Sequence, residues 1–245
     1  MPPKVSLPAE LLNAMVTANR ILVREQVLDA FGHVSVRDPT DNNVFWLAAA
    51  LPPSRVCTGD MLAFDLNGEP VCATDRELFS ERYIHSEIYK AREDVHSVCH
   101  HHAPSILPFC IGNTALEPVS QTGAFLGGPV PVWNSTDEFG DTRLLIDSVA
   151  QAASLAQSLG SGSMVLMRGH GATVVGASVE ELVFKCVFGC KDADHQRAAA
   201  VWGKIAKLSQ GEISKIGQPA AAAVRRAWRH WTAGAETRHD DAEGN

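Results

Sequence analysis

The chain has 245 residues, of which 45% are hydrophobic and 20% charged, and a formal net charge of -7. This length allows one or two domains and a core large enough to fold without disulfides. The acidic balance argues against a nucleic-acid-binding protein, which carries a basic face or stripe. Apolar runs stop well short of the ~20 residues of a membrane span, and the first residues lack a signal peptide's apolar stretch. We therefore expect a soluble, cytoplasmic protein.

The first third of the chain predicts a helix followed by an antiparallel meander. Apolar residues recur at helical spacing from Leu11, and the helix is expected to run to about Ala30. Alternating residues then predict a strand over 33–37. Further strands are expected over 44–51 and 61–64, the last followed by a hairpin turn.

Helices and strands alternate through the rest of the chain, without repeats. Ser178 is the expected cap of a long helix that ends near Leu208, and the polar residues 234–245 predict a disordered tail. Residues 1–233 therefore predict one α/β domain, with an antiparallel-rich sheet covered by helices on both faces. The other expected elements are helices over 77–92, 143–159 and 218–231, a short apolar helix from Pro104, strands over 95–102, 163–168 and 172–175, and short strands within 112–133.

Three adjacent histidines are the most informative of the ten in the chain. Residues two apart in a strand point to the same face, so His100 and His102 are expected side by side. Neutral imidazole suits zinc and other divalent cations, and a catalytic site usually has three protein ligands. His170, between two glycines at an expected turn, is the candidate third ligand. The alternative is a polar strand end with a hydrogen-bonded turn histidine; His96 has the same parity but lies farther away, and we interpret it as structural.

Four short segments carry a family resemblance. They are Gly32–Arg37, Ser80-Glu81 with the helix through His85 and Tyr89, Val98–His102, and Gly169–Gly171 with Val175-Gly176 following. In this order they resemble the class II aldolase/adducin family, over about residues 8–210. The resemblance implies a single three-layer α/β/α domain with a mostly antiparallel central sheet. It also implies a homotetramer with active sites near the subunit interfaces.

The family's site residues transfer to matching positions of this sequence. The resemblance implies that His100, His102 and His170 bind one divalent metal ion per subunit, with zinc preferred and manganese, cobalt or iron as alternatives. It also implies that Glu81 is the catalytic acid or base. From the residue alone, an acidic residue favoured by a helix N-terminus is the better explanation of Glu81.

Departures from the sugar-phosphate members of the family point to a different branch. His33 stands where those enzymes have asparagine, the loop at 50–55 lacks their glycine, and Phe79 replaces a serine. Each change removes a small donor for phosphate. The pattern resembles the decarboxylases that act on dihydroxybenzoates, dihydroxyphthalates or carboxy-hydroxymuconic semialdehydes. An aldolase or epimerase for a sugar or keto-acid, and a non-catalytic adducin-like module, are the alternatives.

The resemblance implies a decarboxylation through a metal-stabilised enolate or phenolate. The substrate is a small carboxylate, its carboxyl group leaves as carbon dioxide, and Glu81 manages the proton at the carbanion. Ser80 and His33 are candidates for binding substrate oxygens. Arg168 is either a clamp for a carboxylate or a structural ion-pairing residue. His85 is expected to orient Glu81, to line the substrate pocket or to pack.

Overall fold

A seven-stranded sheet runs through the middle of the molecule. The structure is a computed structural model that describes residues 7–236. Neighbouring strands are antiparallel, with one parallel pair at the end of the sheet. The strand order is β3 (Met61–Asp65), β2 (Val44–Ala48), β1 (His33–Arg37), β4 (Ser97–His101), β7 (Gly171–Gly176), β6 (Met164–Met167) and β5 (Val132–Trp133).

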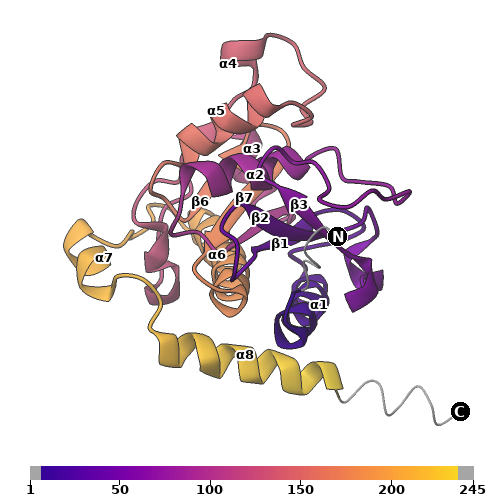
Figure 1. Ribbon diagram of the computed structural model, residues 1–245. Coiled ribbons are helices and arrows are strands. Elements are labelled where there is room, and N and C mark those ends of the chain that lie inside the picture. The colour runs from indigo at the N-terminus through magenta and orange to yellow at the C-terminus, as the bar shows by residue number, and fades with distance from the viewer. Residues whose placement is uncertain (1–6, 237–245) are drawn as a thin grey trace, which may run out of the picture.

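Helices cover both faces of this sheet (Figure 1). On one face lie α1 (Ala9–Arg24) and α6 (Val179–Ala200), and α8 (Ala221–Glu236) packs on both of them. On the other face α2 (Arg82–Ala91) packs against α5 (Val149–Leu159). The shorter helical elements are η1 (Pro53–Arg55), η2 (Thr58–Asp60), α3 (Leu107–Ile111), η3 (Gln121–Leu126), α4 (Thr136–Phe139) and α7 (Gln210–Ile216).

Two apolar clusters fill the two helix–sheet interfaces. Leu22 of α1 and Leu182 of α6 belong to one cluster, and Ile88 of α2 and Leu155 of α5 belong to the other. This arrangement confirms the expected three-layer α/β/α fold with a mostly antiparallel sheet. Within residues 7–236, no helix combines the length and the apolar character that a membrane crossing requires.

Two helices on the same face end earlier than their apolar patterns predict. Helix α1 ends at Arg24 because Gln26 has a φ of 60°, which a right-handed helix does not contain. Helix α6 ends at Ala200 rather than near Leu208, and Gly203 just beyond it has a φ of 121°. In both places a left-handed residue outweighs apolar spacing that would otherwise continue the helix.

Two helices on the other face begin later than expected. Residues 77–81 precede α2 and residues 143–148 precede α5, and neither segment is helical. Helix α5 begins after Ser148, whose side chain accepts a hydrogen bond from the backbone N–H of Gln151. The two non-helical segments meet, because the backbone N–H of Ile146 donates to Oε1 of Glu81 over 3.2 Å. This contact lies beside the candidate site.

The C-terminal helix is longer than expected. Helix α8 continues to Glu236, so residues 234–236, expected in the tail, are helical. The rest of the expected tail, residues 237–245, lies outside the described residues.

The end of β4 and the start of β7 approach each other closely at Gly171. The register pairs His101 with Ala172, one residue beyond this glycine. A Cβ atom on Gly171 would overlap the backbone carbonyl oxygen of His101 and lie 2.8 Å from Cδ2 of His102. Backbone atoms cannot move aside as the end of a flexible side chain can, so the contact requires glycine.

We expect Gly171→Ala to lower the free energy of unfolding by about 1–3 kcal/mol, the usual cost of overpacking. Urea denaturation followed by circular dichroism measures the change. Gly59→Ala is the matched control, because a Cβ there meets no atom within 4 Å. Equal stability losses in the two variants would contradict the close approach.

Candidate active site

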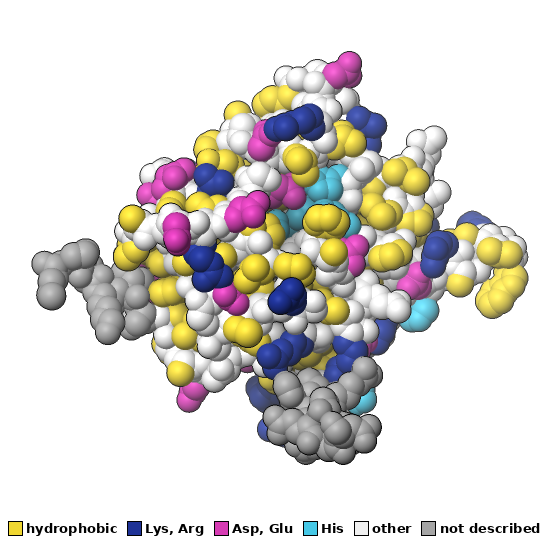
Figure 2. Space-filling view, turned by 90° about the vertical axis from the view of Figure 1, so that its right-hand side faces the viewer, with side chains coloured by type: hydrophobic (Ala, Val, Ile, Leu, Met, Phe, Trp, Pro, Cys, Tyr) yellow, Lys and Arg dark blue, Asp and Glu magenta, His cyan; other side chains and the backbone are white. Residues whose placement is uncertain are grey.

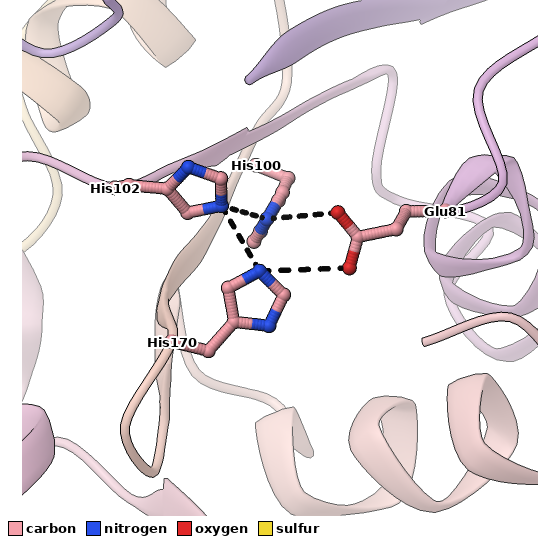
Figure 3. Close-up of side chains that lie close together, drawn as sticks. All are labelled: Glu81, His100, His102 and His170. Carbon is pink, nitrogen blue, oxygen red and sulfur yellow. Dashed lines mark hydrogen bonds and ion pairs between the residues drawn. The ribbon is translucent and has the colours of Figure 1, made fainter. Parts of the chain in front are cut away.

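Four side chains from distant parts of the chain converge where β4 ends and β7 begins, in the middle of the sheet (Figure 3). The Nε2 atom of His102 lies 2.9 Å from Nε2 of His100 and 3.0 Å from Nε2 of His170. The carboxylate of Glu81 completes the cluster, with Oε2 3.5 Å from His100 Nε2 and Oε1 3.6 Å from His170 Nε2. One ligand atom from each residue fits within 4.8 Å of all the others. The structure thus brings together the three expected ligands and the expected acid or base.

The strand pairing explains why the three histidines meet. Strand β4 ends at His101. His100 is therefore the second-last residue of the strand, and His102 is the first residue after the strand. Strand β7 begins at Gly171, next to β4, and His170 lies in the turn that joins β6 to β7. Alternation along the chain therefore holds for His100 and His102, although His102 is outside the strand. The side chain of His101 is fully buried apart from the cluster, and its Nδ1 accepts from the N–H of Ala103.

The protonation of the cluster follows from its contacts. Nδ1 of His100 lies 3.1 Å from the carbonyl oxygen of Ala172, which accepts a hydrogen bond, so Nδ1 carries the proton. The lone pair of His100 Nε2 then faces the cluster. Burial lowers the pKa of His100 and His102, and lowers that of His170 to about 4.

This donor set fits a divalent metal ion. His102 Nε2 faces two imidazole nitrogens, and it can donate a hydrogen to at most one of them. Neutral imidazole nitrogens with lone pairs directed at a common point, beside a carboxylate, are typical ligands of zinc and similar ions. A hydrogen bond from ring nitrogen to a backbone carbonyl, as at His100, is the usual way in which proteins orient such ligands.

Glu81 is held away from the helix that it precedes. It is the residue before the first turn of α2, not a residue within that turn, and its side chain makes no cap hydrogen bond. Its carboxylate points to the histidines and accepts from the N–H of Ile146. The helix-dipole explanation of Glu81 therefore does not account for its side-chain position. Burial raises the pKa of Glu81 to about 7, although the hydrogen bond from Ile146 opposes the shift.

His33 and His85 lie next to the cluster and contact each other. The ring centroid of His33 is 5.3 Å from that of His100, and His33 Nδ1 is 2.6 Å from His85 Nε2. His85 is fully buried and bonds to Ser35. Within the described residues, no hydrogen bond joins His85 to Glu81. His85 thus supports His33 and is not an orienting partner of Glu81.

Ser80 and Arg168 are exposed at the site's periphery. The structure contains no hydrogen bond of the Ser80 side chain to residues 7–236. Nε of Arg168 donates to Oδ1 of Asn134 over 2.6 Å, and no carboxylate of the described chain pairs with its guanidinium. This leaves its other N–H groups for a ligand. Figure 2 shows histidine side chains in a hollow of the surface, between hydrophobic and acidic side chains.

The sequence interpretation gave no role to Ser35 and Tyr89. The Ser35 hydroxyl lies between His85 Nδ1, 2.5 Å away, and the Tyr89 hydroxyl, 2.8 Å away. The spacing of these residues within their strand and helix could have pointed to this contact. Ser35 shares the strand face of His33, and Tyr89 follows His85 by four residues on α2.

Known proteins resemble this chain in sequence and in fold. The family model described as Class II Aldolase and Adducin N-terminal domain matches residues 13–189. Decarboxylase tropJ of Talaromyces stipitatus is 32% identical, over 95% of this chain and 97% of that protein. A 3,4-dihydroxyphthalate decarboxylase of Arthrobacter keyseri is 26% identical, over 71% of this chain and 72% of its own length. The structure of an L-fuculose 1-phosphate aldolase from Glaciozyma antarctica PI12 superposes with a TM-score of 0.77 at 20% identity, covering 98% and 96% of the two chains.

These matches agree with the segments that first suggested a relationship. The aldolase superposition supports the fold alone, since its sequence identity is low. The family model spans the strand of His33, Glu81 and all three converging histidines. The resemblance to the decarboxylase branch, and the expectation of an enzyme of the lyase class, are confirmed. The chain belongs to the class II aldolase and adducin family.

Proposed function

We propose that this enzyme is a divalent-metal-dependent decarboxylase of a dihydroxylated aromatic carboxylate. The substrate class is a dihydroxybenzoate, a dihydroxyphthalate or a carboxy-hydroxymuconic semialdehyde. The observation that carries the proposal is the convergence of three imidazole Nε2 atoms and one buried carboxylate in a 4.8 Å cluster. The decarboxylase tropJ, which aligns with 95% of this chain, supports the choice of reaction.

In this proposal His100, His102 and His170 hold the ion, with zinc preferred and manganese, cobalt or iron as alternatives. The bound ion supplies Lewis-acid stabilisation of the negative charge that departing carbon dioxide leaves on the substrate. The imidazoles suit this task because their burial keeps them neutral. One ion per subunit satisfies the three nitrogen lone pairs.

Glu81 is the proposed acid and base. When the carbon–carbon bond to the carboxyl group breaks, its electron pair stays on the substrate carbon, and that carbon takes a proton. Glu81 supplies this proton, since a carboxyl group with a pKa of about 7 populates both forms near neutral pH. The N–H of Ile146 stabilises the carboxylate that remains, and solvent returns the proton after product release.

The substrate is anionic, and the chain has a net charge of -7. Local positive charge is therefore needed, and the ion and Arg168 are its proposed sources. The N–H groups of Arg168 that Asn134 leaves free can pair with a substrate carboxylate. Ser80 and His33 are proposed to contact substrate oxygens.

We also propose a cytoplasmic homotetramer with active sites near the subunit interfaces, as the family resemblance implies. Phe31 supports an interface beside the site. Its side chain is 67% exposed, and its ring lies 6.5 Å from that of His102.

A substrate panel tests the reaction. We expect the purified, zinc-loaded enzyme to release carbon dioxide from a dihydroxybenzoate or dihydroxyphthalate, measured by coupled assay and by mass spectrometry of the product. Phosphorylated sugars and keto-acids belong in the same panel. Cleavage of those compounds alone would support the aldolase alternative and contradict the proposal.

Metal binding has its own test. We expect His100→Ala and His170→Ala to weaken zinc binding by more than roughly a hundredfold, because even changes outside the ligand set often cost that much. Calorimetric titration of EDTA-stripped protein measures the affinity. His96→Ala is the control, since His96 is exposed on the same stretch of chain. Full zinc affinity in His100→Ala would contradict the assignment of this metal site.

The role of Glu81 can be separated from metal binding. We expect Glu81→Gln to retain zinc and to lower kcat by about 10²–10⁴-fold, the usual contribution of a positioned acid or base. Glu87→Gln is a matched control, because Glu87 is as buried as Glu81 and pairs with Lys90 instead. Loss of zinc in Glu81→Gln would identify Glu81 as a ligand and overturn the acid–base role.

A further inference from the structure

A string of hydrogen bonds runs from His33 at the site into the interior. Nδ1 of His33 lies 2.6 Å from Nε2 of His85, and Nδ1 of His85 lies 2.5 Å from Oγ of Ser35. Oγ of Ser35 lies 2.8 Å from the hydroxyl of Tyr89. All four side chains are buried. The string crosses from β1, which carries His33 and Ser35, to α2, which carries His85 and Tyr89.

The inner end of the string determines its direction. Among the described residues, Ser35 is the only side chain that is hydrogen-bonded to the Tyr89 hydroxyl. The nearby backbone N–H of Val98 is a donor and cannot accept. Burial also raises the pKa of Tyr89 well above its ordinary value, so the phenol keeps its proton. The hydroxyl of Tyr89 must therefore donate to Ser35.

Each later bond follows from the one before it. The Ser35 oxygen accepts from Tyr89, so the single hydrogen of its hydroxyl goes to Nδ1 of His85. His85 then carries its proton on Nε2 and donates to Nδ1 of His33. The opposite direction would leave the Tyr89 hydroxyl buried without an acceptor, which is costly. Burial lowers the pKa of His85 to about 3, so the ring of His85 is neutral and carries a proton on only one of its two nitrogens.

We propose that Tyr89, Ser35 and His85 are positioning residues that hold His33 in its Nε2–H tautomer, so that His33 donates a hydrogen bond to an acceptor oxygen of the substrate. Its Nδ1 edge is taken by His85, and its Nε2 edge has no hydrogen-bond partner in the described part of the chain. The ring stands beside the metal-binding candidates and against Phe79, 4.6 Å between centroids. Such a donor selects a carboxylate, carbonyl or phenolate oxygen and disfavours an amino group or another donor. The identity of that oxygen rests on the proposed decarboxylase function; the tautomer does not.

These hydrogen bonds hold His33 in position and do not lead protons to solvent. Tyr89, at the inner end of the string, is 1% exposed, and the guanidinium of Arg37 covers its ring at 4.7 Å. Arg37 is itself held by the backbone carbonyl oxygens of Val95, Tyr89 and Arg92. These contacts fix the ring of Tyr89 and so the start of the string.

Nitrogen NMR reads the tautomer directly. In zinc-loaded full-length protein with ¹⁵N-labelled histidine, we expect His33 to show a protonated Nε2 and an unprotonated Nδ1, with its signals assigned by comparison with His33→Gln. A protonated Nδ1 in the unsubstituted protein would overturn the inference without the need for any variant.

Ser35→Ala removes the hydroxyl that orients His85, and we expect a mixture of His33 tautomers in this variant. Ser97→Ala is the matched control, because Ser97 is an equally buried strand serine whose hydroxyl bonds, within residues 7–236, only to backbone carbonyl oxygens. It is expected to leave His33 unchanged. A single unchanged tautomer in Ser35→Ala would show that the string does not control His33.

Kinetics test the link to substrate. With the acid that the substrate panel identifies, we expect Ser35→Ala to raise KM and lower kcat/KM by about tenfold, with kcat within about twofold, as for a lost binding interaction. Ser97→Ala is expected to match the unsubstituted enzyme. Unchanged KM in Ser35→Ala would contradict substrate contact by His33. If no acid is decarboxylated, the proposed function fails while the NMR result still decides the tautomer.

Discussion

The close antiparallel contact between β4 and β7 is the constraint on which the site depends. It places the turn before β7 beside the end of β4, so that His170 reaches the two histidines that precede it by about seventy positions. The contact requires Gly171, where any side chain would overlap the backbone of β4. On the far side of β4, β1 pairs His33 with His100. This pairing brings His33 and its partner His85 against the cluster of candidate metal ligands. The site is therefore a property of strand order and register, not of a single loop.

Burial determines the protonation states of the side chains in the candidate site. Desolvation keeps the imidazoles neutral and shifts the carboxyl group of Glu81 toward its protonated form. Neutral imidazole donors around one carboxylate suit a divalent cation.

Local pattern predicted those parts of the site that local geometry controls. The two-residue alternation of β4 placed His100 and His102 on one side, and the paired glycines placed His170 in a turn. The family resemblance was needed to select Glu81. The end of α1 before Gln26 and the start of α5 after Ser148 were missed, because a left-handed residue and a cap outweigh apolar spacing there. The bond between His33 and His85 spans 52 positions, and periodicity within one element does not determine such a pairing.

The buried histidines also couple folding to the release of protons. The pKa values of His85 and His101 are lowered to about 3 in the folded chain, from an ordinary 6.5. Below pH 6.5 the unfolded chain binds protons that the folded chain excludes, so folding releases them, and acid shifts the equilibrium toward the unfolded state until the folded pKa is reached. Glu81 acts in the opposite sense between its folded pKa of about 7 and its ordinary 4.5, because the folded chain keeps that proton. The upward shift of this carboxyl group offsets only part of the downward shifts of the buried histidines, so acid below pH 6.5 destabilises the folded chain.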